Sequence, residues 1–252
     1  MVREAVYAGQ FYPADAEELS KMIDDLLLAG EEKSAKNISK RIRAIVVPHA
    51  GYVYSGEVAA SAYDSIKASK VKKIILLGPS HHSYFEGAYT FSQNWETPLG
   101  TVSVEKAPKL DAIVGDIEHS LEVQIPFLQK IFADFVLVPI IYGEISPKQL
   151  AEKVSPLAEK NSVIIASSDL SHYLPYVEAN KIDKATLGAV VSIDLKKFLS
   201  SGDACGKIGI AALMILAKKL KWKPVLLDYK NSGDTSGDKK GVVGYASIVF
   251  IE

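Results

Sequence analysis

Short runs of apolar residues alternate along this chain with longer segments in which apolar residues recur every three or four positions. The runs predict buried strands at residues 42–47, 72–78, 135–143, 162–168, 224–229 and 242–251. The longer segments predict helices at residues 16–30, capped by Asp15, and at 56–68, 119–131, 146–160, 177–191 and 206–220. Strands that are apolar throughout and alternate with helices are typical of a largely parallel or mixed sheet with helices on both faces.

Weaker patterns predict the remaining parts of the fold. Residues 87–92 and 101–105 flank the turn sequence TPLG and suggest a shorter strand pair. The polar, glycine-rich tract KNSGDTSGDKKG predicts a loop between the last two strands. Because no linker and no repeat divides the sequence, we expect a single α/β domain over residues 1–252.

The composition narrows the classes of function. The chain has 252 residues with 29 basic and 30 acidic side chains, so a dedicated nucleic-acid or anionic-membrane surface is not expected. Its apolar stretches are shorter than the ~20 residues that a bilayer span needs. The N-terminal sequence MVREAVYAGQFYPAD lacks the features of a signal peptide. With one cysteine, the chain can form no internal disulfide, and we expect a cytoplasmic protein that binds a small molecule or a peptide.

Histidines follow three of the predicted strands. His49 lies in PHAGYVYSG after residues 42–47, and His81 and His82 lie in PSHHSYF after residues 72–78. Asp169 and His172 lie in SDLSHY after residues 162–168, so four of the five histidines stand at strand ends. Ligands of open α/β sheets bind at the carboxyl ends of the strands. We therefore expect a histidine-containing site there, with His82 turned away because adjacent side chains after a strand point in opposite directions.

Cys205 stands just before the predicted helix 206–220. The positive end of a helix dipole lowers the pKa of a thiol and favours thiolate, the form that binds metal or attacks electrophiles. The alternative is a small buried apolar residue, which is the common role of a free cysteine.

A second group of candidates lies elsewhere in the chain. His119 and Glu122 are three residues apart on a predicted helix and therefore share one face, with Glu118 beside them. Such a pair can bind a metal or a substrate, and it is equally common on a solvated helix face. Phe11 and Tyr54 are candidates for lining a pocket, although scattered aromatic residues usually belong to the core.

Several of these segments, taken in order, resemble the Memo family. They are AGQFYPA, PHAGYVYSG, LGPSHH, EHSLEVQIPFL, SSDLSHY, CGKIGI and GYASIVF, and they extend over essentially the whole chain. The fold of this family is similar to that of the catalytic subunit of class III extradiol dioxygenases, which use non-haem iron. The resemblance implies a metal site built from His49, His81 and Cys205, with iron(II) as the expected metal and copper or zinc as alternatives.

The resemblance also implies roles for neighbouring residues. His172, with Asp169 near it, matches the acid/base histidine of the dioxygenases, and His119 is expected to line the same pocket. In the dioxygenases two histidines and a carboxylate hold the iron, whereas a thiolate would be the third ligand here.

Three hypotheses follow for the function. The first is a metal-dependent oxidoreductase that acts on a small, possibly aromatic molecule. The second is a non-catalytic binding module that recognises a peptide or a phosphorylated side chain in the same cleft. The third is a hydrolase using Cys205, His172 and Asp169, which ranks last because it leaves His49 and His81 without roles. The sequence does not determine the oligomeric state.

Overall fold

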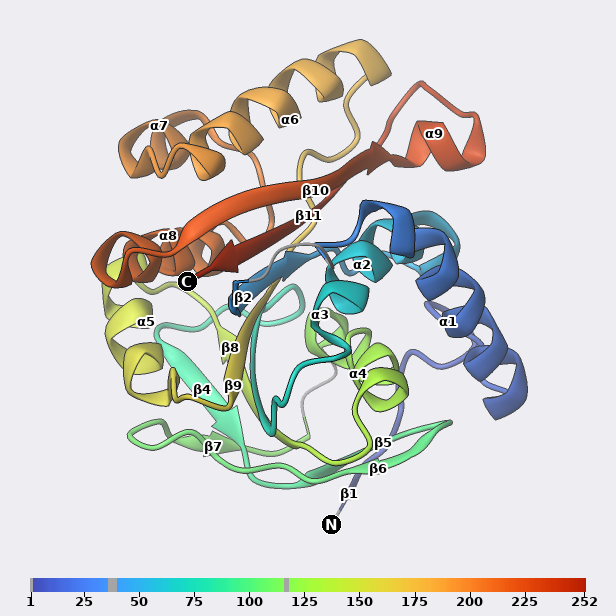
Figure 1. Cartoon of the computed structure of the whole chain (residues 1–252), viewed down its shortest axis with the longest axis vertical. Coiled ribbons are helices and arrows are strands. Elements are labelled where there is room, and N and C mark those ends of the chain that lie inside the picture. The colour runs from blue at the N-terminus through green and yellow to red at the C-terminus, as the bar shows by residue number, and fades with distance from the viewer. Residues whose placement is uncertain (1, 36–39, 116–117) are drawn as a thin grey trace.

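An eight-stranded mixed sheet runs through the molecule, and four parallel strands form its centre (Figure 1). The computed structural model describes residues 2–35, 40–115 and 118–252. In sheet order the strands are β10 (Lys223–Asn231), β11 (Gly244–Ile251), β2 (Ile42–Val47), β9 (Ser162–Ser167), β3 (Lys73–Pro79), β8 (Val136–Tyr142), β4 (Ala88–Phe91) and β7 (Ala112–Ile113). β2, β9, β3 and β8 are parallel. β10 pairs antiparallel with β11, β11 with β2, and β4 with β8, whereas the edge strand β7 is parallel to β4. The expected single α/β domain with a mixed sheet is confirmed.

Helices cover both faces of this sheet because alternate residues of the central strands point to opposite sides. Ile45 and Val47 of β2 pack into one apolar core, and Ala44 and Val46 pack into the other. The first core is covered by α1 (Ala16–Gly30), α2 (Tyr52–Ile66), α3 (His119–Glu122) and α4 (Ile125–Ile131). The second is covered by α5 (Pro147–Val154), α6 (Tyr176–Val191), α7 (Leu195–Ser201) and α8 (Lys207–Leu220). Two layers of helices thus enclose strands that are buried throughout.

The order of the strands sets where the loops meet. The chain passes from β2 over α2 to β3 and from β8 over α5 to β9, so β9 lies between β2 and β3. The two crossovers run in opposite directions along the sheet, and right-handed connections then place α2 and α5 on opposite faces. The carboxyl ends of β2, β9 and β3 consequently lie side by side at a point where the direction of the chain reverses, which is the usual ligand site of such folds.

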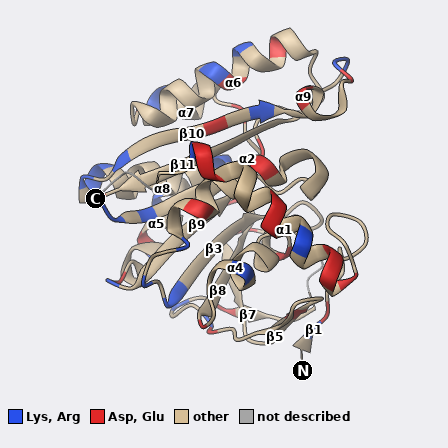
Figure 2. Cartoon of the chain, turned by 45° about the vertical axis from the view of Figure 1, so that its right-hand side comes forward, with Lys and Arg blue, Asp and Glu red and all other residues tan. Residues whose placement is uncertain are grey.

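Charged side chains of both signs are interspersed over the helices (Figure 2). This pattern agrees with the balanced composition of the chain. Among the described residues, no helix combines the length and the apolarity needed to cross a membrane.

One strand prediction was wrong. The segment 101–105 does not pair with 87–92; instead β6 (Gly100–Val102) pairs antiparallel with β5 (Asn94–Thr97). These two strands and β1 (Val2–Arg3) form a separate three-stranded sheet. β5 is short, and polar residues alternate in it with the buried Trp95 and Thr97, so it lacks the continuous apolar run that marks the central strands.

Helix boundaries also differ from the prediction. The predicted helix 119–131 is interrupted between α3 and α4, where Pro126 at the start of α4 has no N–H to continue the hydrogen-bond ladder. The predicted helix 146–160 ends as a short 3-10 turn, Ser155–Leu157, which like Glu31–Lys33 follows an α-helix. The predicted loop before the last strand contains α9 (Ser232–Ser236), which begins with a capping box between Asn231 and Asp234.

Candidate metal centre

Three histidines meet beyond the carboxyl ends of the central strands. The ring centroids of His49 and His81 are 5.1 Å apart, and that of His119 lies 5.2 Å from the first and 4.6 Å from the second. One nitrogen from each ring lies within 4.8 Å of the others, so the three imidazoles could hold a metal ion. The expected histidine-containing group at the strand ends is therefore present, and it includes His119 from α3.

A chain of hydrogen bonds fixes the imidazole of His49, and the donor and acceptor of each bond can be assigned in only one way. Gln124 donates from Nε2 to the carbonyl of Pro48 (2.9 Å) and to Ser167 Oγ (2.8 Å). Ser167 Oγ donates its one proton to the carbonyl of Ser120 (2.5 Å), because a carbonyl can only accept. His49 Nδ1, 2.9 Å from Ser167 Oγ, must then be the donor in this contact. The lone pair of His49 therefore lies on Nε2, the nitrogen left free for a metal.

Glu118 orients His81 in a similar way. Its carboxylate accepts from His81 Nδ1 (2.9 Å) and from the backbone N–H groups of His81 (2.6 Å) and Ser120 (2.9 Å). Burial opposes its ionisation, but these hydrogen bonds outweigh burial and lower the pKa of Glu118 to about 2. With Nδ1 donating to a carboxylate, His81 also presents its Nε2 lone pair. Gly78 in β3 makes this possible, because a Cβ there would lie 2.5 Å from Ser120 Oγ and push α3 away.

His49 and His119 are in the neutral form that binds metals. Burial, followed by the charges of His81 and His119, holds the pKa of His49 well below its ordinary value. Burial also lowers the pKa of His119 to about 4, although Glu118, 3.1 Å from its Nδ1, acts in the opposite direction. At neutral pH both rings are therefore uncharged.

Cys205 contacts one of the three histidines, His49. Its Sγ lies 3.3 Å from His49 Nε2 and accepts from the backbone N–H of Asp169 at 3.2 Å. Gly206 allows this approach, since a Cβ there would lie 2.6 Å from the carbonyl oxygen of Ser167. The expected low pKa of the thiol is wrong for the metal-free chain: burial, and next the charge of Asp169, raise the pKa of Cys205 to about 12. The helix dipole is outweighed by desolvation, and the thiol proton can be donated to His49 Nε2.

Asp169 and His172 lie on the loop that follows β9. Asp169 Oδ1 accepts from the backbone N–H of His49 at 2.8 Å, and burial raises the pKa of this carboxyl to about 7. Burial lowers the pKa of His172, whose charge would in turn act on His49. The loop is held by Ser171, whose N–H donates to Asp183 (3.1 Å) and whose carbonyl accepts from Gly244 (2.9 Å). Asp169 is thus bonded to the backbone of His49, and the role of Asp169 and His172 in proton transfer stays a prediction.

The N-terminal segment forms an aromatic wall beside His119. The ring centroid of Phe11 lies 5.0 Å from that of His119, and Tyr7 lies 5.5 Å from it. The hydroxyl of Tyr7 is 2.8 Å from Nε2 of His82, which is exposed and stacks on the Tyr7 ring. His82, Glu118 and His119 form a second group that could hold a metal ion, so His82 is not turned away from this region as the sequence suggested.

Glu122 anchors this N-terminal segment. Its buried carboxylate pairs with Arg3 Nη1 (2.6 Å) and accepts from Tyr12 Oη (2.8 Å) and the N–H groups of Val6 (3.1 Å) and Tyr7 (2.7 Å). Its predicted contact with substrate would require one of these donors to be displaced. Glu122 thus holds the segment that carries the aromatic wall. It also lies on α3 with His119, and its charge acts to raise the pKa of that histidine, so its predicted contact with substrate stays a prediction.

Tyr54, on the first turn of α2, is 44% exposed and contacts Gly51 near Phe11. It lies at the edge of the site, and its predicted contact with substrate stays a prediction.

Sequence patterns gave no signal for Ser167 or Gln124, because a buried serine or glutamine carries no periodicity. Glu118 had one signal, its N-cap position directly before His119.

Comparison with known proteins identifies the family to which the chain is similar. The model of a family described as "Memo-like protein" matches residues 3–249. A MEMO1 family protein of Nitrosopumilus maritimus is 38% identical, with all of both chains covered. MEMO1 family proteins of Thermoplasma volcanium and Aquifex aeolicus are 38% and 37% identical and cover 98% or more of each chain.

Proposed function

The chain belongs to the Memo family, and from that premise we propose that it is a metal-dependent oxidoreductase that acts on a small, possibly aromatic molecule. His49, His81 and Cys205 are the proposed ligands, and iron(II) is the proposed metal, with copper or zinc as alternatives. When bound, any of these metals would supply a Lewis acid, and iron or copper would also supply a redox centre.

The observation that carries the proposal is the state of the two imidazoles. His49 and His81 each donate from Nδ1 to a fixed acceptor, Ser167 and Glu118, and so direct a lone pair from Nε2 toward the common site. This is the outer hydrogen bonding that orients metal-binding histidines. His119 is a competing candidate for the third ligand, since its ring belongs to the group of three and the Cys205 thiol contacts only His49 within it.

The remaining residues have roles around this centre. His172 is neutral at pH 7 because burial lowers its pKa, so it can accept a proton from a bound substrate. Asp169 holds the backbone of His49 and influences the charge of the site. Phe11 and Tyr54 are proposed to contact the substrate from the aromatic side of the site.

One observation favours the alternative of a non-catalytic binding module for a peptide or a phosphorylated side chain. Without metal the site satisfies its own polar groups, because the protonated Cys205 can donate to His49 Nε2. The hydrolase hypothesis gains nothing, since a thiol with a pKa of about 12 is a weak nucleophile at neutral pH.

Anaerobic titration with iron(II), followed by oxygen uptake with a panel of catechols, tests the proposal. We expect one equivalent of iron and oxygen uptake faster than that of free iron. Tight metal binding without turnover of any member of the panel would favour the binding module.

The third ligand can be tested separately. If Cys205 is the ligand, Cys205→Ser loses iron affinity and His119→Ala keeps it. The opposite result would assign the position to His119 and contradict the thiolate site.

A further inference from the structure

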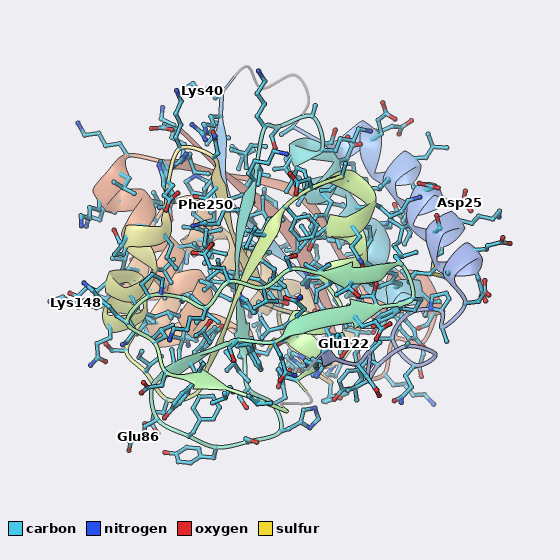
Figure 3. All side chains as sticks on the ribbon, turned by 90° about the horizontal axis from the view of Figure 1, so that it is seen from below. Asp25, Lys40, Glu86, Glu122, Lys148 and Phe250 are labelled. Carbon is cyan, nitrogen blue, oxygen red and sulfur yellow. The ribbon has the colours of Figure 1, made fainter. Side chains whose placement is uncertain are left out.

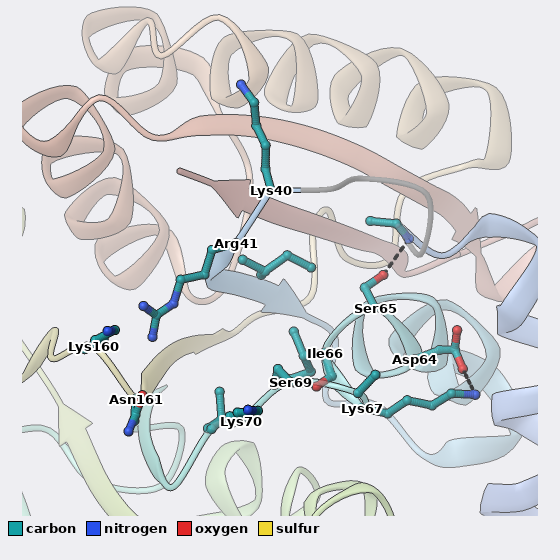
Figure 4. A pocket seen from close by; sticks show the side chains of 14 residues that line it. Lys40, Arg41, Asp64, Ser65, Ile66, Lys67, Ser69, Lys70, Lys160 and Asn161 are labelled. Carbon is teal, nitrogen blue, oxygen red and sulfur yellow. Dashed lines mark hydrogen bonds and ion pairs between the residues drawn. The ribbon is translucent and has the colours of Figure 1, made fainter.

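A cavity lies at the opposite end of the sheet from the histidines. Its volume is about 570 Å³, and it is lined by residues that precede β2, follow α2 and precede β9 (Figure 4). These segments stand at the amino ends of the parallel strands. Figure 3 accordingly shows Lys40, which lines the cavity, far from Glu122 of α3. The cavity therefore shares no residue with the candidate metal centre.

Five cationic side chains line this cavity, and only one of them pairs with a carboxylate among the described residues. The residues that line it include five cations and one carboxylate: Lys40, Arg41, Lys67, Lys70, Lys160 and Asp64. Lys67 pairs with the buried Asp64, as the dashed line in Figure 4 marks. Within residues 2–35, 40–115 and 118–252, no carboxylate lies within 4.0 Å of the other four cations. By contrast, Lys33, Lys73 and Lys230 elsewhere in the chain each pair with an acid.

Part of the cavity lining is apolar and is referred to below as the apolar floor, and the helix end beside it is capped. Ile66 and Val71 are buried, and Ile42 lies half-buried next to them. The carbonyl of Ile66 at the end of α2 accepts from the N–H (3.0 Å) and the hydroxyl (2.6 Å) of Ser69. Because this carbonyl is already bonded, less of the negative end of the helix dipole faces the cations.

We propose that this cavity binds a nucleoside phosphate. The four unpaired cations attract the phosphate groups, and the planar guanidinium of Arg41 suits phosphate oxygens in pairs. The apolar floor receives the base. The volume of about 570 Å³ lies within the range, roughly 300–1,000 Å³, of pockets that take small organic ligands. The site is independent of the proposed metal chemistry at the other end of the sheet.

Calorimetric titration of the full-length, metal-free protein with ADP tests this site. Arg41→Glu/Lys160→Glu removes two cations, whereas Lys181→Glu/Lys184→Glu makes the same change of charge on the exposed surface of α6. We expect one ADP per chain and an affinity about 100-fold lower in the first double variant, since each lost charge-assisted contact costs roughly tenfold. The control should bind ADP as the unaltered protein does. The single variant Lys70→Gln, which is milder, should lose affinity about tenfold or less.

Two further probes test the phosphate and nucleoside parts of the ligand separately. Tripolyphosphate should bind more weakly than ADP because it cannot use the apolar floor, and adenosine should bind more weakly because it lacks the phosphates. The proposal is overturned if ADP does not bind, or if both double variants bind it equally. Tripolyphosphate that binds as tightly as ADP would remove the nucleoside from the proposal.

Discussion

The two ends of the parallel strands differ in how their polar side chains are paired. At the carboxyl ends, His49, Glu118 and Ser167 are buried, and each has hydrogen-bond partners at fixed distances. At the amino ends, Lys40 and Lys160 are exposed and have no carboxylate partner among the described residues. A buried polar group needs a protein partner, whereas water serves an exposed one.

This difference has a consequence for ligand binding. The histidine end is organised before any ligand arrives, because the hydrogen bonds that fix its geometry also stabilise the fold. At the cavity end, the exposed cations are expected to attract anions through their electrostatic field, and ordering their long side chains would cost part of the binding free energy. Single substitutions at the histidine end should therefore strongly affect metal affinity or the free energy of unfolding. Those at the cavity end should change the free energy of unfolding only slightly.

The largest expected effect is loss of metal in His49→Ala or His81→Ala. Each change removes an imidazole whose Nε2 is directed at the site, so affinity should fall by more than the ~10–100-fold that loss of an outer hydrogen bond costs. Metal analysis after anaerobic loading and desalting measures this. His82→Ala is the matched control and should retain metal. Loss of metal in His82→Ala, with retention in His49→Ala, would move the site to the outer group of His82, Glu118 and His119.

The next effect concerns stability at the histidine end. Glu122→Gln removes the buried carboxylate that pairs with Arg3 Nη1 and accepts three further hydrogen bonds. Breaking such a pair costs about 3–5 kcal/mol. Urea unfolding of the metal-free protein measures this loss, and Lys160→Gln at the cavity end should change the free energy of unfolding by less than about 0.5 kcal/mol. Equal effects of the two variants would contradict the contrast between the ends.

Low pH should also destabilise the fold through the groups at the histidine end. The pKa of Glu118 is lowered from 4.5 to about 2 in the folded chain, so its contribution is present above pH 4.5 and is lost as pH falls toward 2. Its size is at most about 3.4 kcal/mol. Burial lowers the pKa of His119 from 6.5 to about 4, so the unfolded chain takes up a proton first and stability also falls with pH between these values.

Unfolding free energies from pH 7 to pH 3 measure this dependence. Glu118→Gln should flatten the part of the curve below pH 4.5, and Lys160→Gln should leave it unchanged, since lysines do not titrate there. A curve for Glu118→Gln parallel to that of the unaltered protein would show that the carboxylate is not responsible.

The sequence predicted the central strands almost to the residue because they are buried on both faces and therefore apolar throughout. Residues 42–47 are β2, and residues 162–168 exceed β9 by one position. The break between α3 and α4 was missed, since the apolar spacing continues across Pro126. The spacing of apolar residues shows which side chains face the core. The backbone can change direction without altering this spacing.

The candidate site was predictable only in part. His49 and His81 stand out because they follow apolar runs, but their partners Ser167 and Glu118 come from segments 118 and 37 residues away. No local pattern marks such long-range pairs. The pKa of Cys205 was predicted with the wrong sign because the helix position is visible in the sequence and the degree of burial is not.

The smallest expected effect tests the hydrogen bond that sets the tautomer of His49. Ser167→Ala removes the acceptor of the Nδ1 proton, so the ring loses both its orientation and its preference for a lone pair on Nε2. Metal affinity should fall about 10–100-fold, as for other outer partners of metal-binding histidines. Ser247→Ala is the matched control, because Ser247 is equally buried and donates to the carbonyl of Val58 rather than contacting a histidine.

A loss of affinity alone could come from altered packing, so a second measurement is needed. Nitrogen-15 chemical shifts of the histidine rings in the metal-free protein distinguish a protonated Nδ1 from a protonated Nε2. The unaltered protein and Ser247→Ala should show His49 protonated at Nδ1 alone, and Ser167→Ala should show a mixture of the two tautomers. If Ser167→Ala keeps a single Nδ1-protonated form and still binds metal weakly, Ser167 acts by packing. If it keeps both the tautomer and the affinity, the chain from Gln124 through Ser167 does not prepare His49 for a metal.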